Sequence, residues 1–133
     1  MERLRLPKNR RLTGNEQFRT VLSHNLCASD AVLTVCIAPN ACGYARLGVS
    51  VGRYSGGSVV RNRLKRLIRE AFRQNQGRLA GGYDYLVMPS RRALRGLSRR
   101  EAGRRTAVLT FEQVEESLLA LVSAAKRKAD NKR

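Results

Sequence analysis

The sequence has few of the residues that hold metals or cross-link small domains. Its 133 residues include one histidine, three cysteines, three prolines and no tryptophan. Cys27, Cys36 and Cys42 show no C-x-x-C spacing, and His24 is the only histidine that could join them. A structural zinc site needs about four such ligands. The sequence therefore predicts no metal site in the protein, and it predicts that Cys36 is a reduced residue of the hydrophobic core.

Long apolar segments are also missing. No run approaches the ~18 apolar residues that a membrane-spanning helix needs. The first residues, "MERLRLPKNRR", contain no apolar core of the kind found in secretory signals. We therefore expect a cytoplasmic protein with no membrane partner. A length of 133 residues suits one domain, covering residues 1–133.

Acidic residues are scarce compared with basic ones. Ten Asp and Glu face 27 Lys and Arg, which gives a formal net charge of +17. A compact domain with this charge repels itself, and a polyanionic partner is the usual reason for it. Arginine is much commoner than lysine, and its planar group suits bidentate contacts to phosphate. No zinc finger, basic zipper or helix-turn-helix pattern is present, so RNA is favoured over DNA.

Hydrophobic periodicity and turn residues predict six elements in the order α-β-β-α-β-α. The first helix begins near Gly14 with a capping box of Thr13 and Glu16, and the last begins with a capping box of Thr110 and Gln113. The remaining elements are two strands joined as an antiparallel hairpin, a basic helix and a third strand, at residues 31–38, 45–53, 58–73 and 81–89. This order predicts an α+β fold, in which helices pack against a small sheet.

The basic helix at residues 58–73 has two distinct faces. Its apolar residues recur at helical spacing on one side: Val60, Leu64, Leu67, Ile68, Ala71 and Phe72. Its cationic and polar residues lie on the other side and along the flanks: Arg61, Asn62, Arg63, Lys65, Arg66, Arg69 and Arg73. Glu70 is the one acid of the helix. The pattern therefore predicts a helix that is anchored in the core and offers a row of positive charge to a partner.

Three segments outside this pattern are strongly basic. Residues 1–12 are predicted to be a basic N-terminal arm, and residues 126–133 a basic tail. Residues 90–107 contain seven arginines, one glutamate and few apolar residues at irregular spacing. This composition favours a poorly ordered basic loop, with a short surface helix as the alternative.

The stretch "RNRLKRLIREAF", preceded by "LGVSVGRYSGGSVV", resembles the RNR motif of the bacterial ribonuclease P protein subunit. The likeness extends to "RRLTGNEQFRTVLSHN", "YDYLVMPSRRA" and "LTFEQVEESLLALV", and so covers nearly the whole chain. The segment from Arg91 to Arg105 is longer than the usual connection in that family. The resemblance implies a single-domain α/β sandwich with a mostly antiparallel sheet and a left-handed βαβ crossover around the RNR helix.

The resemblance also implies a function. Members of the family are subunits of a ribonucleoprotein endonuclease that removes the 5′ leader from precursor tRNA. In that enzyme the catalytic RNA performs the hydrolysis and binds most of the Mg²⁺, and the protein supplies no catalytic residue. The expected partners are therefore the catalytic RNA and precursor tRNA.

Three groups of site residues follow from the resemblance. The RNR helix would contact RNA through Arg61, Asn62, Arg63, Lys65, Arg66, Arg69 and Arg73. A leader cleft between the first helix and the sheet would include Phe18, Arg19, Leu22 and Thr34, and Leu22 replaces a second phenylalanine that is common in the family. The loop before the RNR helix would contribute Arg53, Tyr54 and Gly56, and Tyr54 stands where the family often has a second basic residue.

Two other classes of protein compete with this interpretation. A metal-dependent nuclease would need clustered carboxylates or histidines, whereas the ten acids are scattered along the chain. A ribosomal or assembly protein that binds structured RNA would have the same composition. Only the resemblance to the RNR motif separates this alternative from a ribonuclease P subunit.

Overall fold

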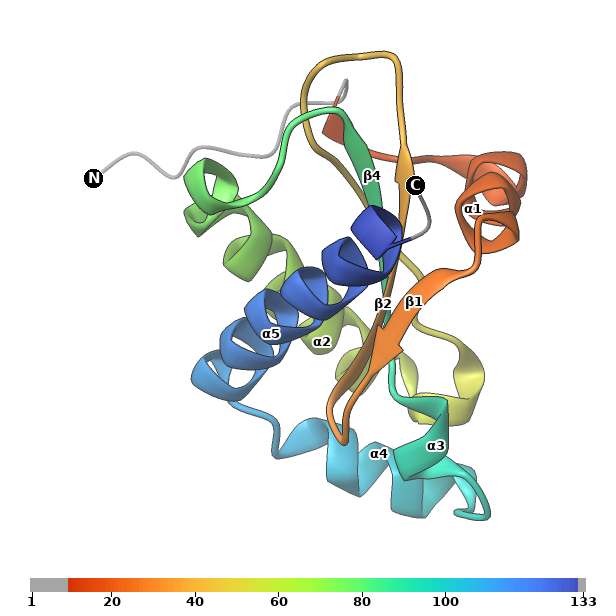
Figure 1. Ribbon diagram of the computed structural model, residues 1–133. Coiled ribbons are helices and arrows are strands. Elements are labelled where there is room, and N and C mark those ends of the chain that lie inside the picture. Colours follow the sequence, from red (N-terminus) through yellow and green to blue (C-terminus); the bar gives the residue numbers. More distant parts are fainter. Residues whose placement is uncertain (1–9, 132–133) are drawn as a thin grey trace.

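The computed structural model describes residues 10–131, which form one four-stranded sheet with helices on both of its faces (Figure 1). The arm predicted at residues 1–12 lies outside this range except for residues 10–12, and so do residues 132–133 of the tail. The elements are α1 Gly14–Ser23, β1 Leu26–Ser29, β2 Leu33–Pro39, β3 Arg46–Val49, the short helix η2 Arg53–Ser55, α2 Ser58–Gln74, η3 Gln76–Arg78, β4 Tyr83–Pro89, α3 Arg91–Leu94, α4 Arg99–Ala107 and α5 Phe111–Asn131.

The sheet has the strand order β1-β2-β4-β3. β2 is antiparallel to both β1 and β4, whereas β3 is parallel to β4, so the sheet is mostly antiparallel as expected. The antiparallel hairpin predicted for residues 31–38 and 45–53 is wrong, because β4 lies between β2 and β3. The apolar run of β4 is buried on both faces, which suits a central strand better than an edge. β3, α2 and β4 form the βαβ crossover that the resemblance implies.

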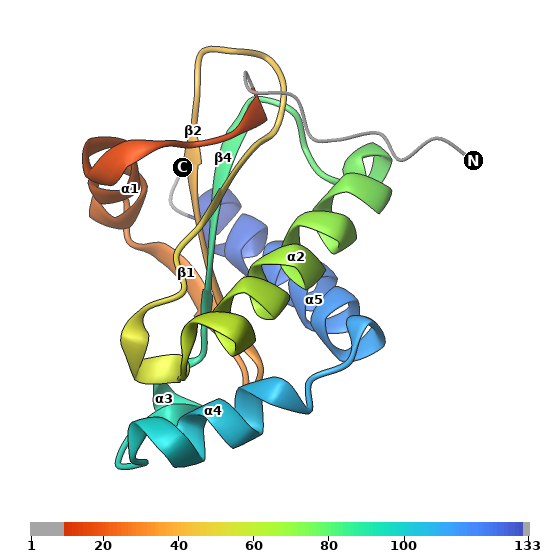
Figure 2. The ribbon, with the colours of Figure 1, turned by 180° about the vertical axis from the view of Figure 1, so that it is seen from behind.

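The two faces of the sheet are covered by different helices. α2 and α5 lie on one face and α1 on the other, as the two opposite views show (Figures 1 and 2). Along β2, Val35 and Ile37 belong to the larger core under α2 and α5, and Cys36 and Ala38 to a smaller cluster under α1. This alternation follows from the two-residue period of a strand.

The helix faces agree with the periodicity of the sequence. In α2, Leu64, Ile68, Ala71 and Phe72 are buried, and Val60 and Leu67 are half-buried. In α5 the buried residues are Val114, Ser117, Leu118, Leu121, Val122 and Ala125. The core is therefore built from the two amphipathic helices that the sequence marks most clearly.

Only one of the two predicted capping boxes forms. At the start of α5, the Gln113 amide N–H donates to the Thr110 hydroxyl at 3.2 Å, and the Gln113 side chain accepts from the Thr110 N–H at 2.9 Å. At α1, Thr13 makes no side-chain cap, and its N–H donates to Gln17 at 2.6 Å instead of to Glu16. The Thr13 and Glu16 box is therefore wrong, although α1 begins at Gly14 as predicted.

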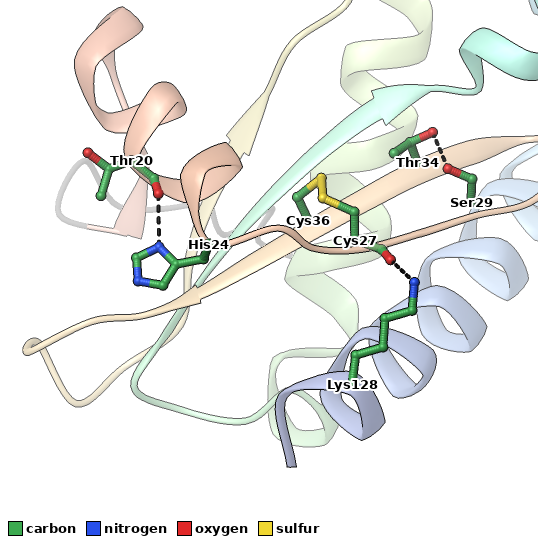
Figure 3. The surroundings of a disulfide bond; sticks show 7 residues. All are labelled: Thr20, His24, Cys27, Ser29, Thr34, Cys36 and Lys128. Atoms are coloured by element: carbon green, nitrogen blue, oxygen red, sulfur yellow. Dashed lines mark hydrogen bonds between the residues drawn. A yellow bond between two sulfur atoms is a disulfide. The ribbon is translucent and has the colours of Figure 1, made fainter. Parts of the chain in front are cut away.

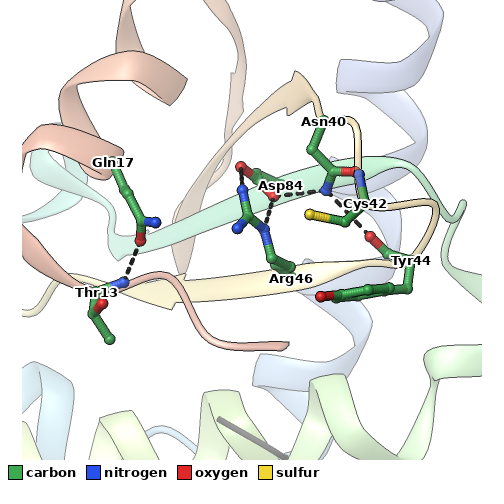
Figure 4. A network of polar contacts seen from close by, with 7 residues as sticks. All are labelled: Thr13, Gln17, Asn40, Cys42, Tyr44, Arg46 and Asp84. Atoms are coloured by element: carbon green, nitrogen blue, oxygen red, sulfur yellow. Dashed lines mark hydrogen bonds and ion pairs between the residues drawn. The ribbon is translucent and has the colours of Figure 1, made fainter. Parts of the chain in front are cut away.

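A partly buried polar contact ties β3 to β4 (Figure 4). Asp84 accepts from Arg46 Nε at 2.7 Å, from Arg46 Nη2 at 2.8 Å and from Asn40 Nδ2 at 2.7 Å. The hydrogen bond to Asp84 raises the pKa of Arg46. This bidentate pair joins the first residue of β3 to the start of β4 and so helps to fix the register of the two parallel strands.

The structure adds a strand, β1, that the sequence did not predict, and it corrects the state of Cys36. Cys27 on β1 lies directly opposite Cys36 on β2, and the two form a disulfide (Figure 3). Cys36 is buried as predicted, but it is not reduced. The pairing was missed because Cys27 was not assigned to a strand. Cys42 is the free, exposed cysteine.

The arginine-rich segment at residues 90–107 is folded, which contradicts the loop that its composition favoured. It forms α3 and α4, and Ser98 and Glu101 make a complete capping box at the start of α4. Residues 126–131 of the predicted tail are the last turns of α5. Across residues 10–131, no helix has both the length and the apolar character required to cross a bilayer.

Candidate nucleic-acid interface

Seven of the residues that the sequence predicts to bind RNA lie on α2, and we call these seven together the RNR face. Asn62, Arg66 and Arg69 are exposed. The other four members are half-buried: Arg61, Arg63, Lys65 and Arg73. Within residues 10–131, neither Arg66 nor Arg69 forms an ion pair or a side-chain hydrogen bond. Their guanidinium groups are therefore available to a partner outside the protein.

Arg73, at the C-terminal end of the RNR face, has a different environment. Its Nε donates to Glu70 at 3.1 Å, and its Nη2 makes a second contact to the same carboxylate. This hydrogen bonding to Glu70 raises the pKa of Arg73. The nearby carboxylate balances the charge of Arg73, so the unbalanced positive charge of the RNR face lies in the N-terminal and middle parts of α2.

Arg61 lies near the N-terminal end of α2. Among the described residues, its Nε is buried and has no hydrogen-bond partner. A buried donor without an acceptor is unfavourable by about 1–3 kcal/mol. Because this atom is buried, an RNA phosphate could reach it only if the Arg61 side chain moved.

The loop before α2 is only partly open. Arg53 is exposed, but the Tyr54 hydroxyl donates to the Pro89 carbonyl at 3.4 Å. Gly56 is buried, and its N–H donates to the Arg53 carbonyl at 3.2 Å. A Cβ added to Gly56 would lie 2.7 Å from the Cα of Gly103 in α4. The Gly56 amide, which the sequence places in the RNA-binding loop, is therefore used inside the protein and is not free for a phosphate.

On the opposite side of the sheet, Phe18 serves mainly as a packing residue. Its half-buried ring lies over β3, where a Cβ on Gly48 would come within 2.8 Å of Phe18 Cε1. Its neighbours on α1, Arg19 and Leu22, are exposed, Leu22 by 45%. Phe18 therefore fixes α1 on the sheet and leaves Arg19 and Leu22 at the surface.

Thr34 lies on the same face of β2 as Cys36, the face that α1 partly covers. Its hydroxyl is 2.8 Å from the Ser29 hydroxyl of β1 (Figure 3). The two residues make a small polar surface beside the Cys27–Cys36 disulfide. The four predicted cleft residues thus share one side of the sheet, and the side-chain hydrogen bond found for Thr34 among the described residues is to Ser29 on β1, not to a residue of α1.

A hollow of about 180 Å³ lies between the two regions. It is bounded by the segment ahead of α1, by β3 and by one residue of the RNR face: Arg11, Leu12, Thr13, Leu47, Val49 and Arg69. Leu12 is held there because its N–H donates to the Leu47 carbonyl at 2.7 Å. Sequence reasoning missed this hollow, because it depends on how residues 10–13 pair with β3.

The packing of α4 against η2 and α2 was also not predicted from the sequence. The signal that could have found this helix is the pair Ser98 and Glu101, whose spacing fits a capping box.

Among residues 10–131, no three His, Cys, Asp or Glu side chains are grouped so that they could hold a metal ion.

Comparisons with known proteins agree with these features. The family model described as Ribonuclease P matches residues 6–126. The ribonuclease P protein component of Clostridium kluyveri is 42% identical over 90 residues, covering 66% of this chain and 80% of that protein. The component of Petrotoga mobilis is 30% identical over 122 residues, covering 92% and 96%.

A solved structure shows the same arrangement of elements. The ribonuclease P protein of Thermotoga maritima superposes with a TM-score of 0.64 at 30% identity, covering 89% of this chain and 94% of that one. The family match spans far more than half of the sequence and includes the RNR face. The chain therefore belongs to the ribonuclease P protein family.

Proposed function

We propose that this chain is the protein subunit of a ribonuclease P, which binds the catalytic RNA and the 5′ leader of precursor tRNA and assists endonucleolytic removal of the leader. Membership of the family supports the subunit role. The single observation that carries RNA binding is the RNR face, where Arg66 and Arg69 are exposed and have no acid partner among the described residues. Because arginine binds phosphate through a planar fork, such a row suits an RNA backbone.

The leader is proposed to run on the α1 side of the sheet. Arg19 and Leu22 are at the surface there, and Thr34 adds a polar group. Because Phe18 packs on Gly48, little of its ring is left for stacking on a base. Stacking on an aromatic ring is worth about 1–3 kcal/mol per base. We therefore expect leader binding to depend more on Arg19 and on backbone phosphates than on stacking.

The chemistry is proposed to belong to the RNA, together with the Mg²⁺ that phosphodiester hydrolysis requires. Several acids of the protein already have structural partners. Asp84 holds Arg46, and Asp30 accepts from the Ser117 hydroxyl and from the backbone of Val32 and Leu33. Glu70 and Glu101 are used by Arg73 and by the start of α4. These contacts support a binding role for the protein and not a catalytic one.

The test is cleavage of a precursor tRNA by the ribonuclease P RNA encoded in the same genome, at low Mg²⁺, with and without the protein. Native protein should stimulate cleavage, and the variant Arg66→Ala/Arg69→Ala should lose most of the stimulation. Both substitutions are on an exposed helical face, where alanine favours the helix, so the fold should be retained.

The control is Arg78→Ala/Arg127→Ala, which removes the same charge from exposed positions in η3 and α5. It should stimulate cleavage like the native protein. If the native protein does not stimulate cleavage but hydrolyses the RNA by itself, the proposal is wrong and a nuclease is indicated. Equal losses in both double variants would show that only net charge matters.

A further inference from the structure

The arginine-rich insert, residues 90–107, is built as a small folded unit. The Ser90 hydroxyl accepts from the Ala93 N–H at 3.2 Å, and the Ser98 hydroxyl accepts from the Glu101 N–H at 3.1 Å. Glu101 is the one acid in this segment, and its side chain accepts from the Ser98 N–H. The insert therefore uses its acid to begin a helix.

The insert is attached to the loop in front of the RNR face. Ala102, Gly103 and Thr106 are the buried side of α4. Gly103 meets Gly56 at backbone distance, since a Cβ on Gly103 would lie 3.3 Å from the Gly56 Cα. Because neither residue has a side chain, α4 can approach the glycine loop this closely.

Three arginines of the insert hold it in place. Arg99 Nε donates to the Gly56 carbonyl at 3.4 Å, and Arg105 Nη1 donates to the Ala93 carbonyl at 2.9 Å. The guanidinium of Arg91 lies 5.2 Å from the centre of the Tyr54 ring, a cation–π distance. These contacts join α4 to the glycine loop, α4 to α3, and α3 to η2.

The other four arginines of the insert do not hold it in place in this way. They are exposed, and within residues 10–131 they form no ion pair or side-chain hydrogen bond: Arg92, Arg95, Arg100 and Arg104. Arg100 and Arg104 are four residues apart, so they share the side of α4 that faces away from the buried residues. Figure 2 shows α4 next to the N-terminal end of α2. The insert thus extends the positive surface beyond the RNR face.

We propose that Arg100 and Arg104, together with Arg92 and Arg95 of the same insert, form a second phosphate-binding surface for folded regions of the catalytic RNA. This inference rests on the proposed function and names a further contact with the same partner. Residues 90–107 contain no aromatic side chain, whereas proteins that bind single strands combine basic grooves with aromatic rings. A folded, arginine-rich surface without aromatic rings suits the backbone of a folded RNA better than a single-stranded leader.

The test measures binding of the full chain to ribonuclease P RNA alone over a range of KCl concentrations. Arg100→Gln/Arg104→Gln should bind more weakly than native protein, and the slope of log affinity against log salt should fall by about 2, one unit for each phosphate that is no longer bound. Arg78→Gln/Arg127→Gln, with the same net charge, should keep the native slope. Thermal unfolding of each variant should show that the fold is intact.

Several outcomes would overturn the proposal. One is that the insert variant Arg100→Gln/Arg104→Gln keeps the native slope of log affinity against log salt. Another is that the charge-matched control Arg78→Gln/Arg127→Gln loses as much affinity as the insert variant. A loss that appears with precursor tRNA but not with ribonuclease P RNA would assign the surface to the substrate instead. If Arg66→Ala/Arg69→Ala weakens RNA binding while the insert variant does not, this inference fails and the proposed function stands. If the native chain does not bind ribonuclease P RNA, both fail.

Discussion

At the scale of single residues, Tyr85 has the strongest perturbation of a titratable group in the core. It is fully buried on β4, and its hydroxyl donates to the Ala80 carbonyl at 2.8 Å. Its ring lies edge-on to Phe72, with centroids 6.0 Å apart. Burial raises the pKa of Tyr85 to about 12, because the phenolate would lose its hydration.

This raised pKa predicts a loss of stability in alkali. The folded state holds the Tyr85 proton more tightly than the unfolded state does, so the stabilisation is complete below about pH 10 and is lost as the pH rises towards 12. A shift of two pKa units corresponds to roughly 2–3 kcal/mol in the free energy of unfolding. Denaturant unfolding at pH 9, 10 and 11 should show the decline.

Tyr85→Phe is the matched variant. It should cost about 1 kcal/mol at neutral pH, because the Ala80 carbonyl loses its donor. Its stability should then fall less between pH 10 and 11 than that of native protein, since no phenol at this position is left to ionise. Identical pH dependence in the two proteins would contradict the assignment.

At the scale of elements, the Cys27–Cys36 disulfide connects β1 to β2 across a short loop. Closing about ten residues predicts a stabilisation of roughly 2–3 kcal/mol in the chain-entropy model. Cys27→Ser should therefore unfold at lower denaturant concentration than native protein in the absence of reductant. With reductant present, the difference should become much smaller.

Cys42→Ser is the control, because Cys42 is exposed and free. It should have native stability with or without reductant. Thiol titration of the unfolded native chain without reductant should find one free thiol, and titration after reduction should find three. Three thiols before reduction would show that the disulfide is absent.

The elements that the sequence predicts well are those with strong local periodicity. α2 and α5 keep their apolar stripes, and β4 keeps its bounds almost to the residue, because burial of one face is encoded in consecutive residues. β1 was missed because four residues carry too short a pattern. The predicted pairing of β2 with β3 was also wrong, since the turn after β2 suits a hairpin whether or not β3 pairs there.

In the candidate site, too, the features that local sequence encodes could be predicted and those that depend on distant residues could not. The RNR face could be predicted because it needs only the helical spacing of one segment. The burial of Gly56 could not, because it depends on Gly103, 47 residues later in the chain. α4 itself has little apolar periodicity, and its packing through Ala102, Gly103 and Thr106 uses small residues that composition treats as neutral.

At the scale of the whole molecule, positive charge should act on the stability of the fold and on the proposed RNA binding in opposite directions. The net charge is +17, and the ion pairs among the described residues include two on helix surfaces, Arg73 with Glu70 and Lys126 with Asp130. Such surface ion pairs contribute little to the stability of the folded protein. Repulsion among the cations should therefore dominate the dependence of stability on salt. Added salt screens this repulsion, whereas the same salt weakens binding to RNA phosphate.

We therefore expect the melting temperature of the free protein to rise with KCl between about 20 and 500 mM, while its affinity for ribonuclease P RNA falls. A change of about 1 kcal/mol would raise the melting temperature by roughly 4 °C in a domain of this size. Arg78→Gln/Arg127→Gln lowers the net charge by two and should show a smaller rise. A melting temperature that falls with KCl would mean that the ion pairs, chiefly Arg46 with Asp84, outweigh the repulsion between cations.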